Sequence, residues 1–168
     1  MQRTRYNPIV TRKLKPEDVY EVVQIEKQCF SDPWSESAIL ESALSPNSYF
    51  IVAVKKFERE KDEEKKILGY AGLYAAGEEA YVYNIAVRPE WQGKGIGKSL
   101  INELVSYCLK NNLGFISLEV RISNNIAINL YKKFGFKILG KRRNFYKNPS
   151  EDALIMTKYF IVDQFYSQ

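Results

Sequence analysis

A glycine-rich turn in the middle of the chain constrains the fold more than any other feature of the sequence. It follows a strand-like run at 80–87 and leads into a helix-like run that begins near Ile96. The turn reads Arg88-Pro89-Glu90-Trp91-Gln92-Gly93-Lys94-Gly95-Ile96-Gly97-Lys98-Ser99. Glycines at such a junction let the backbone approach an anion, and the helix N-terminus adds a favourable dipole. The junction therefore predicts an α/β fold with a candidate phosphate-binding turn.

The spacing of the glycines argues against two common phosphate-binding motifs. A P-loop, G-x-x-x-x-G-K-S/T, needs one residue more than Gly93 and Gly97 enclose. The dinucleotide-binding pattern, G-x-G-x-x-G, needs a wider second gap than Gly95-x-Gly97 provides. A tight turn that binds nothing stays open as the alternative.

The rest of the chain predicts alternating strands and helices in one domain over residues 1–168. Ser35 is expected to cap a short helix, and Asn124 or Asn125 a later one. The charged run at 55–66 is expected to be a solvated connection. The order of the predicted strands and helices along the chain indicates a mixed sheet with helices on its faces. Strands are expected at 8–14, 49–54, 67–75, 80–87, 115–120, 136–145 and 153–160, and helices at about 16–30, 35–44, 96–110 and 125–134.

Composition narrows the chemistry. The chain has 168 residues and no histidine, which excludes Ser-His-Asp and Cys-His nucleophiles and any zinc site that uses histidine. Acid–base work must then fall to carboxylate, tyrosine, lysine, thiol or water. Cys29 and Cys108 both lie in helical apolar patterns and form a poor disulfide framework. With no secretory signal or apolar membrane span, a cytoplasmic location without membrane association is expected.

The positive charge is concentrated in one part of the chain. The net charge is +5, and the basic stretch, residues 120–150, has eight basic residues and no acidic one. The remainder has 17 basic and 20 acidic residues, so the basic stretch supplies the whole surplus. An acidic ligand, a nucleic-acid-rich partner or a solvated face would each explain it. Direct nucleic-acid binding is not expected as the main function, because no recognised binding motif accompanies the charge.

The turn resembles the signature of a known enzyme family. Gln92-x-x-Gly95-x-Gly97 matches the Q/R-x-x-G-x-G/A motif of the GNAT (GCN5-related N-acetyltransferase) family. The segments 84–89, 118–124 and 127–136 are similar to its neighbouring strands and helix end. The resemblance implies a single GNAT domain with a mixed, mostly antiparallel sheet of about seven strands, helices on both faces and parallel strands that splay at the cofactor site. It also implies acetyl-CoA as the acetyl donor and no metal.

A closer resemblance is to RimI-type members of the family. It rests on Phe30–Ser35, Leu118–Arg121, Asn144–Tyr146 and Glu151–Ala153. It implies acetylation of a protein N-terminal α-amine, with a small-subunit ribosomal protein expected as the acceptor. A small-molecule amine, a lysine side chain or a catalytically silent acyl-CoA-binding module are the alternatives. The oligomeric state and the preferred N-terminal residue stay open.

The resemblance assigns roles to particular residues. Glu119 is implied as the base and Tyr131 as the proton donor to the leaving thiolate. The alternative for Glu119 is an ion pair with Arg121 or another basic residue, and the alternative for Tyr131 is a core tyrosine. The implied cofactor-binding residues are Ile85, Ala86, Val87, Gln92, Gly93, Lys94, Gly95, Ile96, Gly97, Lys98 and Asn124.

The acceptor side is less firmly implied. Trp34 and Tyr146 are candidates to line the peptide groove, and a core role is the alternative for Trp34. Glu151 and Asp152 either meet the incoming cationic amine or flank the last turn. The basic stretch is expected to assist with the coenzyme's phosphates or with docking on an RNA-rich ribosomal precursor, unless it is a solvated face.

Overall fold

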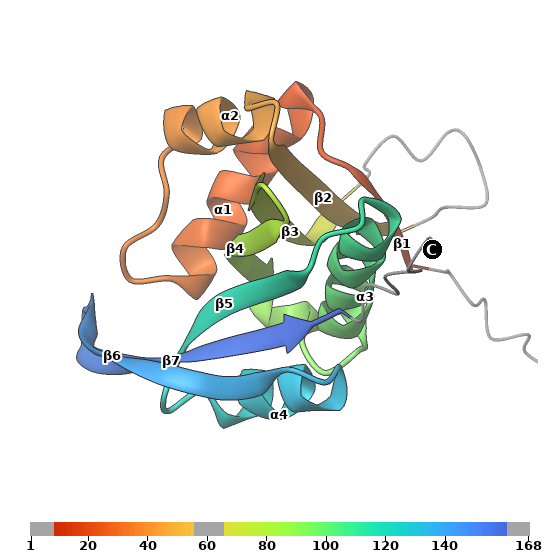
Figure 1. The fold of residues 1–168 in the computed structure, drawn as a ribbon. Coiled ribbons are helices and arrows are strands. Elements are labelled where there is room, and N and C mark those ends of the chain that lie inside the picture. Colours follow the sequence, from red (N-terminus) through yellow and green to blue (C-terminus); the bar gives the residue numbers. More distant parts are fainter. Residues whose placement is uncertain (1–8, 56–65, 161–168) are drawn as a thin grey trace, which may run out of the picture. The chain divides into compact units, whose positions relative to one another are not determined.

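The computed structural model describes residues 9–55 and 66–160. Their strands form a mixed sheet in the order β1-β2-β3-β4-β5-β7-β6 (Figure 1). Most of the charged run at 55–66 lies outside the described residues. The elements are β1 (Ile9–Lys13), η1 (Pro16–Asp18), α1 (Val19–Cys29), α2 (Glu36–Leu44), β2 (Ser48–Lys55), β3 (Ile67–Ala76), β4 (Glu79–Val87), η2 (Pro89–Trp91), α3 (Ile96–Lys110), β5 (Phe115–Arg121), α4 (Asn125–Lys133), β6 (Lys137–Lys147) and β7 (Ser150–Tyr159).

The chain divides into two compact units. Unit 1 comprises Met1–Gly72 and Asn84–Leu100, and unit 2 comprises Leu73–Tyr83 and Ile101–Gln168. β3, β4 and α3 each contribute residues to both units. The chain therefore passes between the two units within three of its elements.

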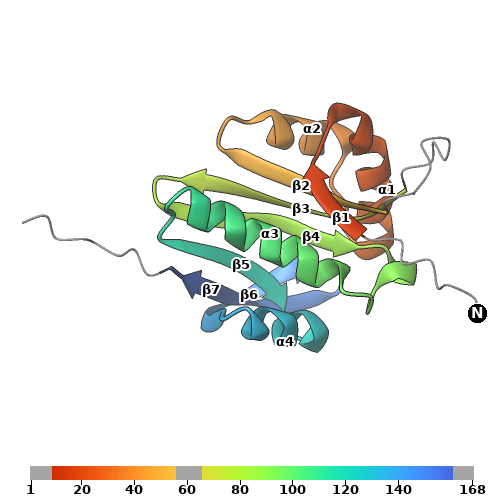
Figure 2. The same ribbon diagram turned by 90° about the vertical axis from the view of Figure 1, so that its right-hand side faces the viewer.

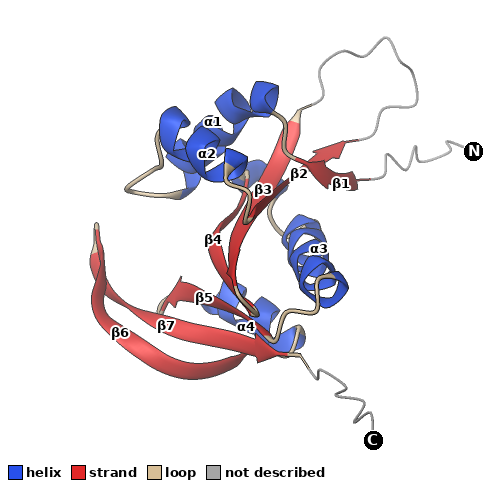
Figure 3. Ribbon diagram, turned by 45° about the horizontal axis from the view of Figure 1, so that its top comes forward, coloured by secondary structure: helices blue, strands red, loops and turns tan. Residues whose placement is uncertain are grey.

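In unit 1, β1 pairs antiparallel with β2 from Ile9↔Lys55 to Lys13↔Ile51. The helices α1 and α2 lie side by side in Figures 1 and 3, and both contribute fully buried isoleucines, Ile25 and Ile39. The predicted helix near Pro16 begins with the 3-10 turn η1, and α1 follows it. Ser35 caps α2 as predicted, because its hydroxyl accepts the Ala38 N–H at 3.2 Å.

In unit 2, β5 pairs in parallel with β4 and antiparallel with β7, and β7 pairs with β6 (Figure 2). The parallel pairing covers Glu79–Tyr81 with Phe115–Ser117, whereas β4 continues to Val87 and β5 to Arg121. Asn124 caps α4, since its side chain accepts the Ala127 N–H at 3.2 Å. The sheet, with one parallel pair among antiparallel ones, confirms the predicted fold class.

Three further features concern the described residues as a set. None of their helices combines the length and the hydropathy needed to cross a membrane. Within 9–55 and 66–160, no group of three metal-binding side chains is placed to hold a metal ion. Cys29 and Cys108 are both free thiols.

Candidate active site

The glycine-rich turn has the backbone geometry that its sequence predicts. Gly93 and Gly95 adopt positive φ angles of 74° and 84°, which residues with a side chain rarely adopt. A Cβ atom built on either glycine would meet nothing within 4 Å. The surface of the turn in unit 1 is therefore open directly above these two backbone positions, as a site for an anion requires.

The N-terminus of α3 adds unpaired amides to this turn. The first i→i−4 bond of the helix runs from the Ser99 N–H to the Gly95 carbonyl at 3.1 Å. The amides of 96–98 precede that bond, and the first amides of a helix have no partner within it. These donors carry the positive end of the helix dipole. Ile96 is buried and fixes the first turn of the helix in the core.

The polar side chains of the turn bond to the turn itself or to the end of the strand before it. Gln92 donates from Nε2 to the Val87 carbonyl at 3.1 Å, which links the end of the turn to the end of β4. The Lys94 ammonium donates to the Glu90 carbonyl at 3.1 Å and lies 4.4 Å from the centre of the Trp91 ring. In this conformation both side chains shape the turn, and Lys98 is exposed. An anion at this turn would therefore be bound mainly by backbone N–H groups.

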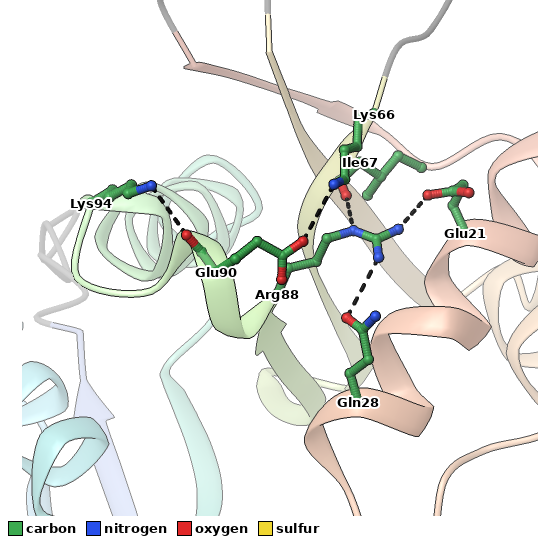
Figure 4. A network of polar contacts seen from close by, with 7 residues as sticks. All are labelled: Glu21, Gln28, Lys66, Ile67, Arg88, Glu90 and Lys94. Atoms are coloured by element: carbon green, nitrogen blue, oxygen red, sulfur yellow. Dashed lines mark hydrogen bonds and ion pairs between the residues drawn. The ribbon is translucent and has the colours of Figure 1, made fainter.

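The strand that leads into the turn is held by Arg88 (Figure 4). Its side chain is buried and donates from Nε to the Ile67 carbonyl at 2.7 Å. Its guanidinium also pairs with Glu21 and lies 3.5 Å from the Gln28 side-chain oxygen. These contacts hold the end of β4 against β3 and α1. The position of the first residue of the turn is therefore fixed. At the same place the Val87 carbonyl accepts a bond from the Cys29 thiol at 3.3 Å.

In unit 2, Glu119 is the half-buried carboxylate on β5. Its Oε1 lies 3.3 Å from the Arg142 guanidinium on β6, and the Glu119 side chain is 28% exposed. The alternative of an ion pair with Arg121 or another basic residue therefore applies, and the partner is Arg142. Arg121 instead pairs with Glu151 at 3.0 Å. A partially exposed carboxylate with a loosely placed cation can still accept a proton from a bound amine.

Tyr131 is buried beside Phe136, with 5.8 Å between the ring centres. Burial, reinforced by the neighbouring Tyr146, raises the pKa of Tyr131 above its usual value. Burial also raises the pKa of Tyr146 to about 12, while Arg121 lowers it and Glu119 raises it. Both hydroxyls therefore keep their protons at neutral pH. Unit 2 thus brings Glu119, Tyr131 and Tyr146 together.

The two acidic residues at the start of β7, Glu151 and Asp152, already have hydrogen-bond and ion-pair partners within the protein. Glu151 accepts the Ser123 N–H at 2.7 Å in addition to its bond with Arg121. Asp152 accepts the Asn144 N–H at 2.9 Å and pairs with Lys141 at 3.1 Å. These contacts favour a structural role at the last turn over contact with an incoming amine.

Trp34 lies in the loop between α1 and α2 of unit 1, and its side chain is half-buried. Its backbone N–H donates to Glu26 Oε2 at 2.8 Å. Glu26 is fully buried and also accepts bonds from the Tyr70 hydroxyl and from Asn84 Nδ2. Burial raises the pKa of Glu26, although these hydrogen bonds act in the opposite direction.

Sequence reasoning missed Glu26, and it included Arg142 only as part of the basic stretch. The signal for Glu26 was present, because it occupies a position on the apolar stripe of Val19, Val22 and Val23 at helical spacing. No comparable signal in the sequence identifies Arg142 as the partner of Glu119. Its approach to Glu119 depends on the order β5-β7-β6, which local sequence does not determine.

Comparison with known proteins places the chain in a family. The model of the Acetyltransferase (GNAT) family matches residues 19–136. The "Putative ribosomal protein bS18-alanine N-acetyltransferase" of Bacillus subtilis (strain 168) is 36% identical over 146 residues, covering 86% of this chain and 91% of the relative. The ribosomal protein bS18-alanine N-acetyltransferase of Escherichia coli (strain K12) is 31% identical over 145 residues, covering 85% and 92%.

Solved structures agree with this result. The ribosomal-protein-S18-alanine N-acetyltransferase from Escherichia coli superposes with a TM-score of 0.80 at 28% identity, covering 95% of this chain and 99% of that one. Arabidopsis thaliana NAA60 in complex with acetyl-CoA has the same fold, with a TM-score of 0.80 at 20% identity and coverage of 91% and 99%. The chain belongs to the acetyltransferase (GNAT) family, and it is an N-acetyltransferase of the RimI-like kind.

Proposed function

We propose that this protein transfers the acetyl group of acetyl-CoA to the N-terminal α-amine of a protein, with a ribosomal protein as the acceptor. The observation that carries the proposal is the similarity to ribosomal protein bS18-alanine N-acetyltransferases over 85–86% of the chain. The whole of residues 1–168 is proposed to act as one acetyltransferase domain, in the cytoplasm.

The glycine-rich turn is the proposed binding site for the coenzyme's pyrophosphate. Its open backbone at Gly93 and Gly95 and the first amides of α3 fit a group with two adjacent phosphates. The backbone of Ile85–Val87 is the proposed partner of the pantetheine arm, and Asn124 is a further proposed contact. The Val87 carbonyl already accepts two bonds, and the Ala86 carbonyl lies against Gly69 of β3, so Ile85 offers the better backbone carbonyl.

The chemistry of an α-amine suits a site without histidine. An α-amine has a pKa of roughly 7.7–8.0, so a substantial fraction is neutral near pH 7. A lysine amine, with a pKa of about 10.4, is far less often neutral. A carboxylate is therefore a sufficient base for an N-terminus, and the chain offers Glu119 for this role.

The proposed reaction is direct transfer. The neutral amine attacks the thioester carbonyl, the C–N bond forms, and the C–S bond breaks as the intermediate collapses. Glu119 accepts the proton that the nitrogen loses, directly or through one water, and Tyr131 donates its proton to the departing thiolate. The raised pKa of Tyr131 means that the phenol is still protonated when the thiolate leaves.

The acceptor peptide is proposed to contact Trp34 and Tyr146. Tyr146 lies near both Glu119 and Tyr131, and its ring stacks against the Arg121 guanidinium at 4.2 Å. These interactions fix the orientation of an aromatic side chain beside the proposed base.

A peptide library tests the proposal. Purified protein is incubated with acetyl-CoA and peptides that differ in their first residues, and the site of acetylation is read by tandem mass spectrometry. We expect acetylation of α-amines, with the bS18 N-terminal sequence among the best substrates. Acetylation of lysine side chains or of polyamines alone would reject the proposed acceptor and leave the family assignment intact.

A further inference from the structure

A buried carboxylate in unit 1 has no part in the proposed reaction. Glu26 on α1 has no exposed surface, yet both of its oxygens are hydrogen-bonded. Oε1 accepts from the Tyr70 hydroxyl and from Asn84 Nδ2, the latter at 3.0 Å. Oε2 accepts from the backbone N–H of Trp34 at 2.8 Å. These four groups are called the Glu26 network.

The Glu26 network joins segments that are distant in sequence. Tyr70 lies on β3, and Asn84 lies on β4 immediately before the proposed pantetheine contact, Ile85–Val87. Trp34 lies in the loop between α1 and α2. Burying a carboxylate is costly even when it is bonded, and an apolar side chain at this position would fill the core without that cost. What the carboxylate adds, and an apolar side chain could not, is a hydrogen bond that holds the loop between α1 and α2 in place.

Glu26 holds both ends of the loop. Its backbone carbonyl accepts the Phe30 N–H at 2.9 Å, where α1 ends, and its side chain accepts the Trp34 N–H four residues later. Ser35 follows at once and caps α2. The residues between these two bonds, 31–33, are exposed and are not part of a helix or strand. One residue, Glu26, therefore anchors the chain on both sides of 31–33.

We infer that Glu26 is a positioning residue, which holds the Trp34 loop in the conformation that receives the acceptor protein. This inference rests on the proposed function, in which Trp34 contacts the acceptor. Glu26 acts through Trp34 and is not itself in contact with the substrates. Loss of the contact should weaken acceptor binding and leave the chemical step and donor binding nearly unchanged.

The substitution Glu26→Gln isolates the contact. Glutamine keeps the size of the side chain but has one oxygen and one amide donor, while all three partners in the network are donors. An oxygen toward Tyr70 and Asn84 places the amide against the Trp34 N–H. We expect the acceptor-peptide KM to rise about tenfold, as for loss of one hydrogen bond to a charged group, with kcat and acetyl-CoA Kd within about twofold.

Asp18→Asn is the matched control. Asp18 is a second buried carboxylate next to α1, but it is bonded to the Arg12 guanidinium and the Lys15 N–H and does not contact the Trp34 loop. This control should lower the thermal midpoint without raising the acceptor KM. An equal rise in KM for Asp18→Asn would mean that general destabilisation explains the effect, and would overturn the inference.

Two measurements do not depend on turnover. In a Trp91→Phe background, Trp34 is the remaining tryptophan, and its fluorescence should become more accessible to acrylamide after Glu26→Gln but not after Asp18→Asn. In the wild-type protein, the Trp34 amide should be protected from hydrogen exchange although it lies in a loop. The exchange measurement serves even if Glu26→Gln fails to fold.

The outcomes separate this inference from the proposed function. Rapid exchange of the Trp34 amide, or unchanged quenching, would overturn the positioning role whatever the activity. Increased quenching with an unchanged acceptor KM would overturn the link to the acceptor. A wild-type protein that is inactive on every peptide but has a protected Trp34 amide would reject the proposed function. The hydrogen bond by which Glu26 holds the Trp34 loop would still stand.

Discussion

Tyr131 illustrates how the location of a residue sets its chemistry. Burial raises its pKa, so its hydroxyl stays protonated at pH values where an exposed tyrosine begins to ionise. The proposed nucleophile behaves in the opposite way, because the neutral fraction of an α-amine grows as the pH rises through roughly 8. The two groups are therefore both in their reactive forms on the alkaline side of neutrality.

This difference predicts the shape of the pH–rate profile. With saturating substrates, kcat should rise with pH to about 8 and then stay level to about pH 10, because Tyr131 keeps its proton over that range. Initial rates from pH 6 to about 10, in buffers of constant ionic strength, test the prediction. A decline with its midpoint below about 10 would contradict the assignment of a buried tyrosine as the acid.

The two proposed catalytic residues have matched controls on β4. Glu119→Gln and Tyr131→Phe should each lower kcat about 100-fold, the usual contribution of an acid or base, with little change in acetyl-CoA affinity. Glu79→Gln and Tyr81→Phe remove a hydrogen-bonded pair of the same residue types and should leave kcat unchanged. Rates of Glu119→Gln and Tyr131→Phe that equal the wild-type rate would show that neither residue has the proposed role.

At this scale the sequence predicted residue types better than residue partners. The family motif placed Glu119, Tyr131 and Tyr146, and unit 2 brings these three side chains together. An ion pair of Glu119 was one of the alternatives, but its partner Arg142 could not be identified, because the two strands are separated by β7 in the sheet. Contacts of that kind depend on tertiary packing and leave no local pattern.

At the scale of elements, the glycine-rich turn is where backbone conformation and binding meet. Gly95→Ala places a methyl group in the open space above the turn and requires alanine at a φ of 84°. We expect a loss of about 1–2 kcal/mol in unfolding free energy from the left-handed backbone. We also expect acetyl-CoA to bind about tenfold more weakly, since the methyl group would obstruct one proposed phosphate contact.

Gly77→Ala separates these two effects. Gly77 has a φ of 61° and no atom within 4 Å of a built Cβ, but it lies in the turn between β3 and β4. The stability loss in urea denaturation should be similar, and calorimetry should give an unchanged acetyl-CoA Kd. Equal weakening by both substitutions would count against the turn as the pyrophosphate site.

Element boundaries followed closely from local signals. Serine and asparagine caps fixed the beginnings of α2 and α4, and Gly135 at a φ of 85° follows the end of α4. The order of the last three strands did not follow, because β6 precedes β7 in sequence but β7 pairs with β5. Pairing between strands that are not consecutive is decided by which hydrophobic faces the whole chain buries.

At the scale of the whole molecule, the two compact units share β3, β4 and α3. Neither unit can lose its structure without unfolding part of a strand or helix that the other needs. We therefore expect a single unfolding transition for the described part of the chain. Independent domains joined by a linker would instead unfold in separate steps.

Native probes can follow each unit. Trp34 and Trp91 both lie in unit 1, and the free thiol of Cys108 lies in unit 2, where burial raises its pKa to about 12. In a Cys29→Ser background, tryptophan fluorescence and the reactivity of Cys108 toward a thiol reagent should give the same urea midpoint. Midpoints that differ beyond experimental error would mean that the units unfold separately.

The exposed strand β6 affects the tendency of the protein to aggregate at high concentration. It is one of the two edge strands of the sheet, it has five lysine or arginine residues, and register shifts interrupt its pairing with β7. Charged and irregular edge strands resist pairing with the edge of another molecule. Part of the positive surplus thus protects the protein against edge-to-edge aggregation, which is a benefit of the basic stretch that requires no bound partner.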